Sequence, residues 1–263
     1  MARLGRFLAA LTLLLLAPLP ALAAGCFAAV AATVPPIIPA ALRLAEAGEV
    51  GLTFLGHASF LIESPGGVTA VTDYNGFNGA HLVPDIVTMN HAHTTHYTDI
   101  IDPGVKWVLR GWDTGGGIAH HDVKVRDMRV RNVPTNIRDW GGGSIPYGNS
   151  IFIFEVAGLC IGHLGHLHHT LTDQQIAQIG QLDVVMVPVD GSYTMDTAGM
   201  VEVLKALRAR LVLPMHYFNP YTLDRLLARI RDEFLVETLR EPMIVVSQAT
   251  LPSESKVLVL PGN

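Results

Sequence analysis

The apolar and polar positions divide the chain into a half made of short strands and a half in which helices alternate with strands. From Val50 onward, apolar runs separated by turn residues predict strands in "VGLTFL", "SFLIES", "GVTAVTD", "DIVTMN", "KWVLRGW" and the alternating "VKVRDMRVRNV". A glycine-rich loop, "DWGGGSIPYGN", is expected next. The runs "SIFIFEV" and "LCIGH" then predict a hairpin that turns at Ala157 and Gly158.

After His169 the spacing of apolar residues becomes that of helices. The segment "TDQQIAQIGQ" predicts a helix with Thr172 as its N-cap, "DTAGMVEVLKAL" a second helix, and "TLDRLLARIRDEF" an amphipathic third. The runs "DVVMVPV", "RLVLPMH", "MIVVSQ" and "KVLVLP" predict strands. This order favours two sheets packed between helix layers over one doubly wound sheet. We therefore expect an α/β fold, a four-layered αββα sandwich.

Residues 1–25 have the pattern of a secretory signal peptide. Arg3 and Arg6 form a short positive region, an apolar run extends from residue 7 to 19, and "ALAAGC" supplies small residues for cleavage, expected after Ala23. The apolar run is shorter than the roughly 20 residues of a spanning helix, so a cleaved signal is favoured over a membrane anchor. We therefore predict an exported, periplasmic protein without a membrane span.

The remainder of the chain is predicted to hold an N-terminal lead-in over 26–48, rich in Ala and Pro, and one domain over 49–263. A lipid anchor on Cys26 is the alternative to a free protein. It is disfavoured because Ala23, and not leucine, stands three residues before the cysteine.

Charge and cysteine content narrow the function further. Without Arg3 and Arg6, 16 Lys and Arg face 23 Asp and Glu, a formal charge of −7, and no basic patch is visible, so nucleic acid is not expected as a partner. Two cysteines, Cys26 and Cys160, do not make a disulfide framework. Cys160, in the apolar "GLCIGH", is expected to be a small buried hydrophobic residue, and the cysteine count excludes a Cys-based zinc site.

Three segments that each follow a predicted strand carry histidines. "TMNHAHTTHY" has His91, His93 and His96, "GHLGHLHH" follows "LCIGH", and "LVLPMHY" ends with His216. Histidine is the commonest metal ligand, and loops at strand ends can direct several rings to one point while leaving a position open for water. A histidine-rich surface loop is the alternative for "TMNHAHTTHY" alone, but convergence of three segments favours a metal site. His81, His120 and His121 lack this setting and are expected to be solvated.

These segments resemble the metallo-β-lactamase fold hydrolases, in particular their lactonase-like branch. "FLGHASFLIES" resembles that branch's opening hairpin, "MNHAHTTHY" its His-x-His-x-Asp-His signature, "IGHLGHLHHTLTDQQIAQIGQLDVVMVPVDG" its Gly-Asp-Leu-Gly-His segment, and "LVLPMHY" its last metal-binding loop. The four occur in the family's order between Val50 and Pro261. The resemblance implies the same sandwich fold and a metal-dependent hydrolase.

The departures from the family pattern concern the metal ligands. Thr95 stands where the signature has aspartate, His166 where the family's bridging aspartate falls, and Asn136 and Ile137 where this branch often carries a further histidine. Two close divalent ions need negative ligands to offset their repulsion, and an imidazole set does this poorly. We therefore expect one ion and not two. Imidazole ligands suit zinc, our first assignment, but also iron and copper.

The residues expected to form the site follow from these comparisons. The leading assignment is one ion on His91, His93 and His166, with His96 and His216 as further ligands or a weak second site. Asp190, in "VPVDG", could return a carboxylate to the site as ligand, orienting group or general base, or it could only form a turn before Gly191.

Four other residues are expected to support the site without binding the ion. Thr95 could hold a water molecule, and His169 is expected to line the pocket. Asp73 could orient a ligating histidine or form an Asx turn. His57 could face the pocket or make a structural hydrogen bond.

Three functions agree with these residues. The first is an exported hydrolase that activates water on the metal and acts on a small-molecule ester, lactone, amide or phosphodiester. The second is a redox or metal-handling protein with iron or copper. The third is a binding protein that has lost catalysis.

Overall fold

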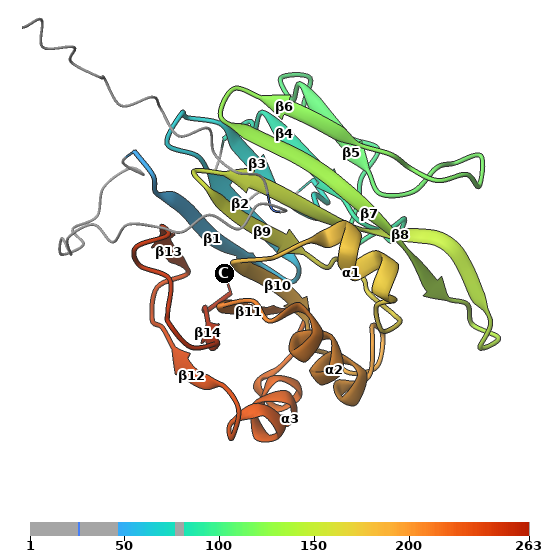
Figure 1. Ribbon diagram of the computed structural model, residues 1–263. Coiled ribbons are helices and arrows are strands. Elements are labelled where there is room, and N and C mark those ends of the chain that lie inside the picture. Colours follow the sequence, from blue (N-terminus) through green and yellow to red (C-terminus); the bar gives the residue numbers. More distant parts are fainter. Residues whose placement is uncertain (1–25, 27–46, 77–81, 263) are drawn as a thin grey trace, which may run out of the picture.

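The computed structural model describes residues 26, 47–76 and 82–262, and within them two β-sheets pack face to face (Figure 1). The first sheet has six strands in the order β13-β1-β2-β3-β4-β5. Their bounds are β1 Val50–Gly56, β2 Ser59–Glu63, β3 Thr69–Val71, β4 Ile86–Met89, β5 Trp107–Arg110 and β13 Met243–Val246. Strands β3, β4 and β5 run parallel to one another, so their carboxyl ends share one edge.

The second sheet has eight strands in the order β12-β14-β11-β10-β9-β8-β7-β6. Their bounds are β6 Asp122–Val125, β7 Met128–Arg138, β8 Ser144–Val156, β9 Leu159–His163, β10 Val184–Pro188, β11 Leu211–Met215, β12 Leu235–Thr238 and β14 Lys256–Val259. Strands β9, β10 and β11 are parallel, and β6 to β9 form antiparallel pairs.

Three helices, α1 Asp173–Ile179, α2 Thr197–Leu207 and α3 Pro220–Ile230, cover the outer face of the second sheet (Figure 1). Each begins at a capping side chain, and the predicted Thr172 cap is confirmed, because its hydroxyl accepts a hydrogen bond from the Gln175 N–H in a capping box. Helix α3 starts two residues before the predicted segment because Asn219 caps it and Pro220 occupies its first turn.

The alternation of side chains along β10 shows how the layers pack. Val184 and Met186 lie in the core between the two sheets, whereas Val185 and Val187 face the helices. The outer face of the first sheet is covered by side chains of the segment 82–112 and not by a described helix. The predicted α/β sandwich is thus confirmed, with its helices on one side within the described residues.

Two local predictions need correction. The expected glycine-rich loop is short, because β7 continues to Arg138 and β8 starts at Ser144, so most of that stretch forms a long hairpin. Strand β12, whose four residues are all on the surface, carries no apolar alternation and is not predicted by the sequence.

The cysteines also differ from expectation. Cys26 and Cys160 form a disulfide with their Cα atoms 5.8 Å apart, so Cys160 is not an unpaired buried residue. Cys26 packs into the core beneath the helices, and its carbonyl oxygen accepts a hydrogen bond from the Gln181 N–H. The predicted signal peptide and most of the lead-in lie outside the described residues.

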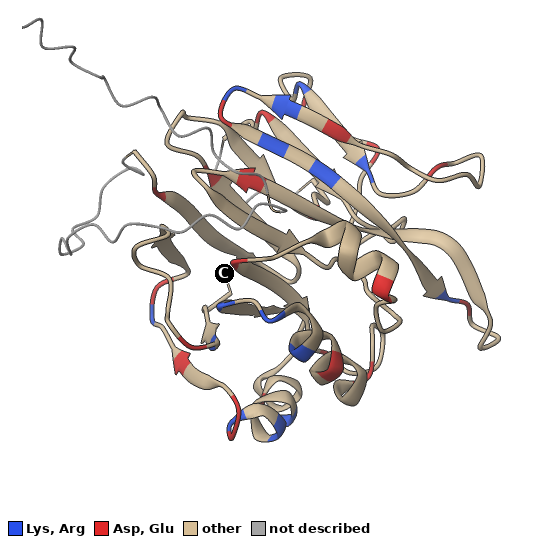
Figure 2. Ribbon diagram, viewed as in Figure 1, with Lys and Arg blue, Asp and Glu red and all other residues tan. Residues whose placement is uncertain are grey.

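Charged residues of both signs are interspersed along the ribbon in Figure 2. Several lie on β6 to β8, where Arg129 pairs with Asp122 and Glu155, and Arg131 with Glu155. No helix among the described residues is long and apolar enough to cross a membrane.

Candidate metal centre

Strand ends from both sheets bring the histidines to one point. His57 follows β1, His91 and His96 follow β4, His166 follows β9, and His216 follows β11. The parallel order of β3 with β4 and of β9 with β11 puts these carboxyl ends at a common edge of the sandwich. The three predicted segments therefore do converge, and the loop after β1 joins them.

His96 and His216 form the centre of the cluster. Their rings stack at 5.1 Å between centroids and 10° between planes, and their Nε2 atoms are 3.1 Å apart. His57 lies 4.3 Å from His216 and 5.3 Å from His96 between ring centroids, and its buried Nε2 has no hydrogen-bond partner. Within the described chain, these three form the one group whose ligand atoms all lie within 4.8 Å of each other.

A buried carboxylate fixes the orientation of His96. The Nδ1–H of His96 donates to Asp73 Oδ2 at 2.6 Å, and the Asn90 N–H donates to Asp73 Oδ1 at 2.9 Å. Asp73 lies two residues after the end of β3 and has a positive φ of 43°, so the turn directs its buried side chain into the sandwich. With the proton on Nδ1, the Nε2 atom of His96 presents a lone pair to His216.

A second buried carboxylate, that of Asp190, lies beside His216. Asp190 Oδ2 lies 2.9 Å from His216 Nδ1, although the ring is turned so that the contact is not a well-aligned hydrogen bond. The remaining Asp190 lone pairs accept bonds from the Ser192, Tyr193 and Thr194 N–H groups and from the Thr194 hydroxyl. Asp190 therefore forms the turn and also contacts a ring of the cluster, and its role as ligand, orienting group or general base stays a prediction.

Burial sets the charge of these groups. It lowers the pKa of His96 well below its ordinary range, and the neighbouring His216 and His57 rings lower it further. Burial, followed by the proximity of His216, also lowers the pKa of His57 to about 4. Burial opposes ionisation of Asp190, but contacts with His216 and Thr194 outweigh it and hold the pKa of that carboxyl below its usual value. At neutral pH the rings of His57 and His96 are thus neutral and lie near an ionised carboxylate.

His91 and His93 lie at the outer side of the cluster. The Nδ1–H of His91 donates to the Gly148 carbonyl oxygen at 2.6 Å, which leaves its Nε2 unprotonated. Exposed His93 contacts the Thr95 hydroxyl through Nδ1 at 2.9 Å, and its ring is 6.3 Å from that of His91. Thr95 is therefore a hydrogen-bond partner of His93.

His166 is in contact with the central pair, 4.7 Å from His96 and 5.1 Å from His216 between ring centroids, and nearly perpendicular to both. Its Nδ1 lies 2.6 Å from His168 Nε2. His168 Nδ1 in turn accepts a hydrogen bond from the Arg138 N–H at 2.8 Å.

The remaining sequence candidates take positions outside the centre. His169 is next to His168, 6.5 Å between ring centroids, and the described ring contacts include none between it and the cluster. Fully buried His163 bonds the Ala58 carbonyl oxygen through Nε2. The predicted trio His91, His93 and His166 differs from the compact trio His57, His96 and His216, and which of them binds an ion stays a prediction. His57, expected from the sequence only to face the pocket or to make a structural hydrogen bond, lies in the compact trio.

Aromatic side chains lie at the edge of the cluster. Phe218 is 5.5 Å from the His216 ring and 5.7 Å from the His57 ring, and Tyr193 packs edge-on against Phe218 at 5.6 Å. Both aromatic side chains are more than half exposed, so they offer a contact surface beside the histidines.

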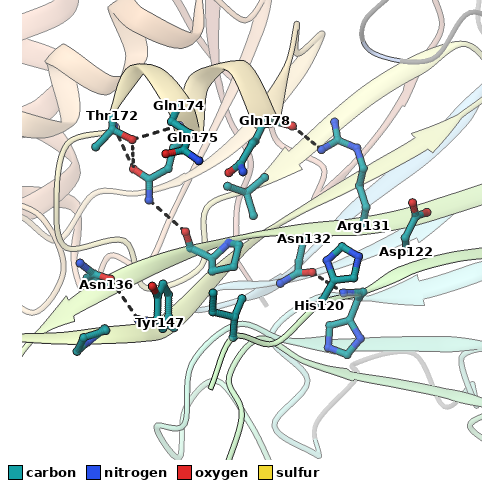
Figure 3. A pocket seen from close by; sticks show the side chains of 15 residues that line it. His120, Asp122, Arg131, Asn132, Asn136, Tyr147, Thr172, Gln174, Gln175 and Gln178 are labelled. Atoms are coloured by element: carbon teal, nitrogen blue, oxygen red, sulfur yellow. Dashed lines mark hydrogen bonds between the residues drawn. The ribbon is translucent and has the colours of Figure 1, made fainter. Parts of the chain in front are cut away.

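A separate cavity of about 740 Å³ lies between β6, β7, β8 and α1 (Figure 3). Its lining includes His120, Asn136, Gln174 and Gln178, and none of the clustered histidines. His121, Asp122 and Arg131 also line it, and because none of the clustered histidines does, we do not assign the reaction to this cavity.

Comparison with known proteins agrees with the architecture. Residues 51–216 match the model of the Beta-lactamase superfamily domain, which spans more than half of the chain and includes every clustered histidine. The chain belongs to the β-lactamase superfamily. Its relatives include a UPF0173 metal-dependent hydrolase from Carboxydothermus hydrogenoformans, 26% identical over 189 residues that cover 63% of this chain and 84% of the relative.

Solved structures share the fold. A candidate Zn-dependent hydrolase of the metallo-β-lactamase superfamily from Thermotoga maritima has a TM-score of 0.59 and 27% identity, covering 80% of this chain and 98% of that one. Igni18, a metallo hydrolase from Ignicoccus hospitalis, has a TM-score of 0.53 and 22% identity, covering 82% and 97%. The relatives are named metal-dependent hydrolases, and a divalent metal is accordingly indicated for the histidine cluster.

Proposed function

We propose that this member of the superfamily is an exported hydrolase that uses one divalent ion, held by His96, His216 and His57, to activate water. The observation that carries the proposal is the 3.1 Å contact between the Nε2 atoms of His96 and His216. Each ring has Nδ1 beside a carboxylate, hydrogen-bonded in His96 and in proximity only in His216, and the negative charge favours the proton on Nδ1, so that two lone pairs face each other at that contact.

The donor set fits a cation. Facing lone pairs repel unless a proton or a metal ion lies between them. Burial lowers the pKa of His96 far below neutrality, which disfavours the proton. The buried, unpartnered Nε2 of His57 offers a third nitrogen, and three histidines with one open position are a common set for catalytic zinc.

Two carboxylates keep the ligand nitrogens of His96 and His216 ready to bind the ion. When bound, the ion would lower the pKa of a water molecule and polarise a carbonyl or phosphoryl oxygen of the substrate. Asp73, through its hydrogen bond to His96, and Asp190, through its negative charge beside His216, favour the proton on Nδ1 of each ring and so keep each Nε2 available. We assign Asp190 this orienting role in preference to that of general base, because donors already occupy both its oxygens.

Zinc is the metal we favour, and one ion is favoured over two. The T. maritima relative in structure is named for zinc dependence, and imidazole ligands suit zinc. Neither Thr95 nor His166 supplies the negative charge that a second ion close by would need. We assign His91 and His93 to the polar lining of the site or to a weak second metal site. His169 and Thr95 are assigned to the lining of the pocket.

Export is supported by the disulfide between Cys26 and Cys160. Disulfides persist in oxidising compartments such as the periplasm and are rare in the cytosol. A cysteine sulfur joined to Cys160 cannot also carry a lipid, so the disulfide argues against the lipid-anchored alternative. Cleavage after Ala23 would leave Cys26 near the start of the mature chain.

Elemental analysis of untagged protein tests the proposal. We expect one zinc per chain, turnover of at least one member of a panel of small esters, lactones, amides and phosphodiesters, and loss of both in His96→Ala and His216→Ala. The exposed His120→Ala is the matched control and should retain both. Absence of stoichiometric metal would overturn the proposal, and iron or copper without hydrolysis would favour the redox alternative.

A further inference from the structure

We propose that His166 carries its proton on Nε2 and is a hydrogen-bond donor in the site, not a ligand of the ion. The sequence position of His166, where the family has a bridging aspartate, predicts a metal ligand instead. The proposed tautomer follows from a chain of hydrogen bonds that starts at a backbone amide and ends at the cluster, through Arg138, His168 and His166.

The first step fixes His168. The Arg138 backbone N–H can only donate, and it points at His168 Nδ1 from 2.8 Å. That nitrogen must therefore accept and has no proton. An imidazole without a proton on Nδ1 carries its proton on Nε2, so the Nε2 of His168 is a donor.

The second step fixes His166. The protonated Nε2 of His168 lies 2.6 Å from His166 Nδ1, which must accept. The proton of His166 is therefore on Nε2, and the lone pair that a metal ion would need at that nitrogen is absent. His96 and His91 have the opposite assignment, because their Nδ1 atoms face the acceptors Asp73 Oδ2 and Gly148 O.

The position of the ring gives this N–H a role. His166 is buried, its backbone N–H is held by Asn149 Oδ1, and its ring is nearly perpendicular to those of His96 and His216. No described residue forms a hydrogen bond with its Nε2, so that N–H is free to donate to another acceptor. Given the proposed function, that acceptor is the substrate oxygen on which negative charge develops during hydrolysis. The positive end of the same N–H dipole also disfavours a second cation beside the first.

Nitrogen-15 NMR of the metal-free protein tests the tautomer directly. Long-range proton–nitrogen spectra should show His166 and His168 protonated on Nε2, and His91 and His96 protonated on Nδ1. In His168→Phe no donor faces Nδ1 of His166, so a fraction of His166 should be protonated on Nδ1. An Nδ1 proton on His166 in the wild-type protein would overturn the proposal.

Zinc titration provides a second readout that does not depend on turnover. We expect His166→Ala to bind one zinc with an affinity within about threefold of the wild type. In His96→Ala the zinc affinity should fall by more than about 100-fold, because loss of a group that only orients a ligand already lowers it by about 10–100-fold. His120→Ala is the control. An equal loss in His166→Ala and His96→Ala would make His166 a ligand. Failure of the wild type to bind zinc would contradict the proposed function, while the NMR result would still decide the tautomer.

Discussion

The ring of His96 faces that of His216 across 3.1 Å between their Nε2 atoms, and a buried carboxylate lies on the far side of each ring. Asp73, from the first sheet, contacts His96, and Asp190, from the second, contacts His216. The two halves of the sandwich therefore contribute matching carboxylate–histidine pairs. Such partners fix the tautomer of a ligand and raise its basicity.

Loss of either carboxylate should weaken metal binding. We expect Asp73→Asn and Asp190→Asn to lower zinc affinity by about 10–100-fold, because an amide no longer selects the tautomer with a free Nε2. Competition with a fluorescent chelator measures the change. Asp113→Asn, at an exposed turn, is the control. Intact affinity together with abolished turnover in Asp190→Asn would instead make Asp190 a general base.

The metal-free protein should lose stability as the pH falls below about 6.5. Burial lowers the pKa of six histidines in the folded state, namely His57, His91, His96, His163, His166 and His168. Below the unfolded-state pKa the unfolded chain binds protons that the folded chain does not, so the free energy of unfolding decreases by up to about 1.4 kcal/mol per pH unit for each fully buried ring.

Urea denaturation in the presence of a chelator, at pH 7.5, 6 and 5, measures this dependence. The steepest loss should occur between pH 6.5 and 4, above the range in which most carboxylates titrate. A free energy of unfolding that is constant between pH 7.5 and 5 would contradict the burial of these rings.

Gly165→Ala should disturb the site and the fold together. Gly165 has a φ of +59°, and an added Cβ would meet the Asn90 side chain, with its Cγ atom only 2.6 Å away. The free energy of unfolding should fall by about 1–2 kcal/mol from the left-handed backbone strain. Overpacking should lower it by about 1–3 kcal/mol more, because the loops before His91 and His166 would have to separate.

Gly142→Ala is the matched control for that experiment. Gly142 also has a positive φ, +83°, but open space lies where its Cβ would be. It should show the strain alone and retain zinc. Equal thermal stability of the two variants would show that contact with Asn90 does not constrain Gly165.

Reduction of the disulfide should destabilise the protein by about 2–5 kcal/mol. The cysteines are 134 residues apart, and in the chain-entropy model closing so long a loop restricts the unfolded state by about 5 kcal/mol. Denaturation with and without reductant measures the difference. The Cys26→Ser/Cys160→Ser double variant should match the reduced wild type and not respond to reductant. No response in the wild type would mean that the bond does not form.

Much of the fold could be predicted because local patterns and global packing agree. The run "DVVMVPV" is apolar at every position after Asp183, and β10 is buried on both faces, between the second sheet's helices and the first sheet. Likewise, the capping signal at Thr172 marks where α1 begins. The convergence of His96 and His216 was predictable because both follow strands whose carboxyl ends share an edge.

The features that the sequence did not reveal depend on contacts between distant residues. His57 follows the first strand alone, so no cluster marks it, and its role depends on the backbone bond from the His216 N–H to its carbonyl oxygen. Cys26 and Cys160 pair across 134 residues. The tautomer of His166 depends on Arg138, 28 positions upstream, and composition or spacing cannot indicate such a contact.

The division of the ligands between the two sheets affects how the protein obtains its metal. His57 and His96 belong to loops of one sheet and His216 to the other, so no compact ligand set exists until the sheets have packed together. A chain that crosses a membrane unfolded would carry no ion with it and would load only where folding ends. Imidazole ligands discriminate weakly among divalent metals, so the ion bound in the cell would reflect which metals are available in that compartment.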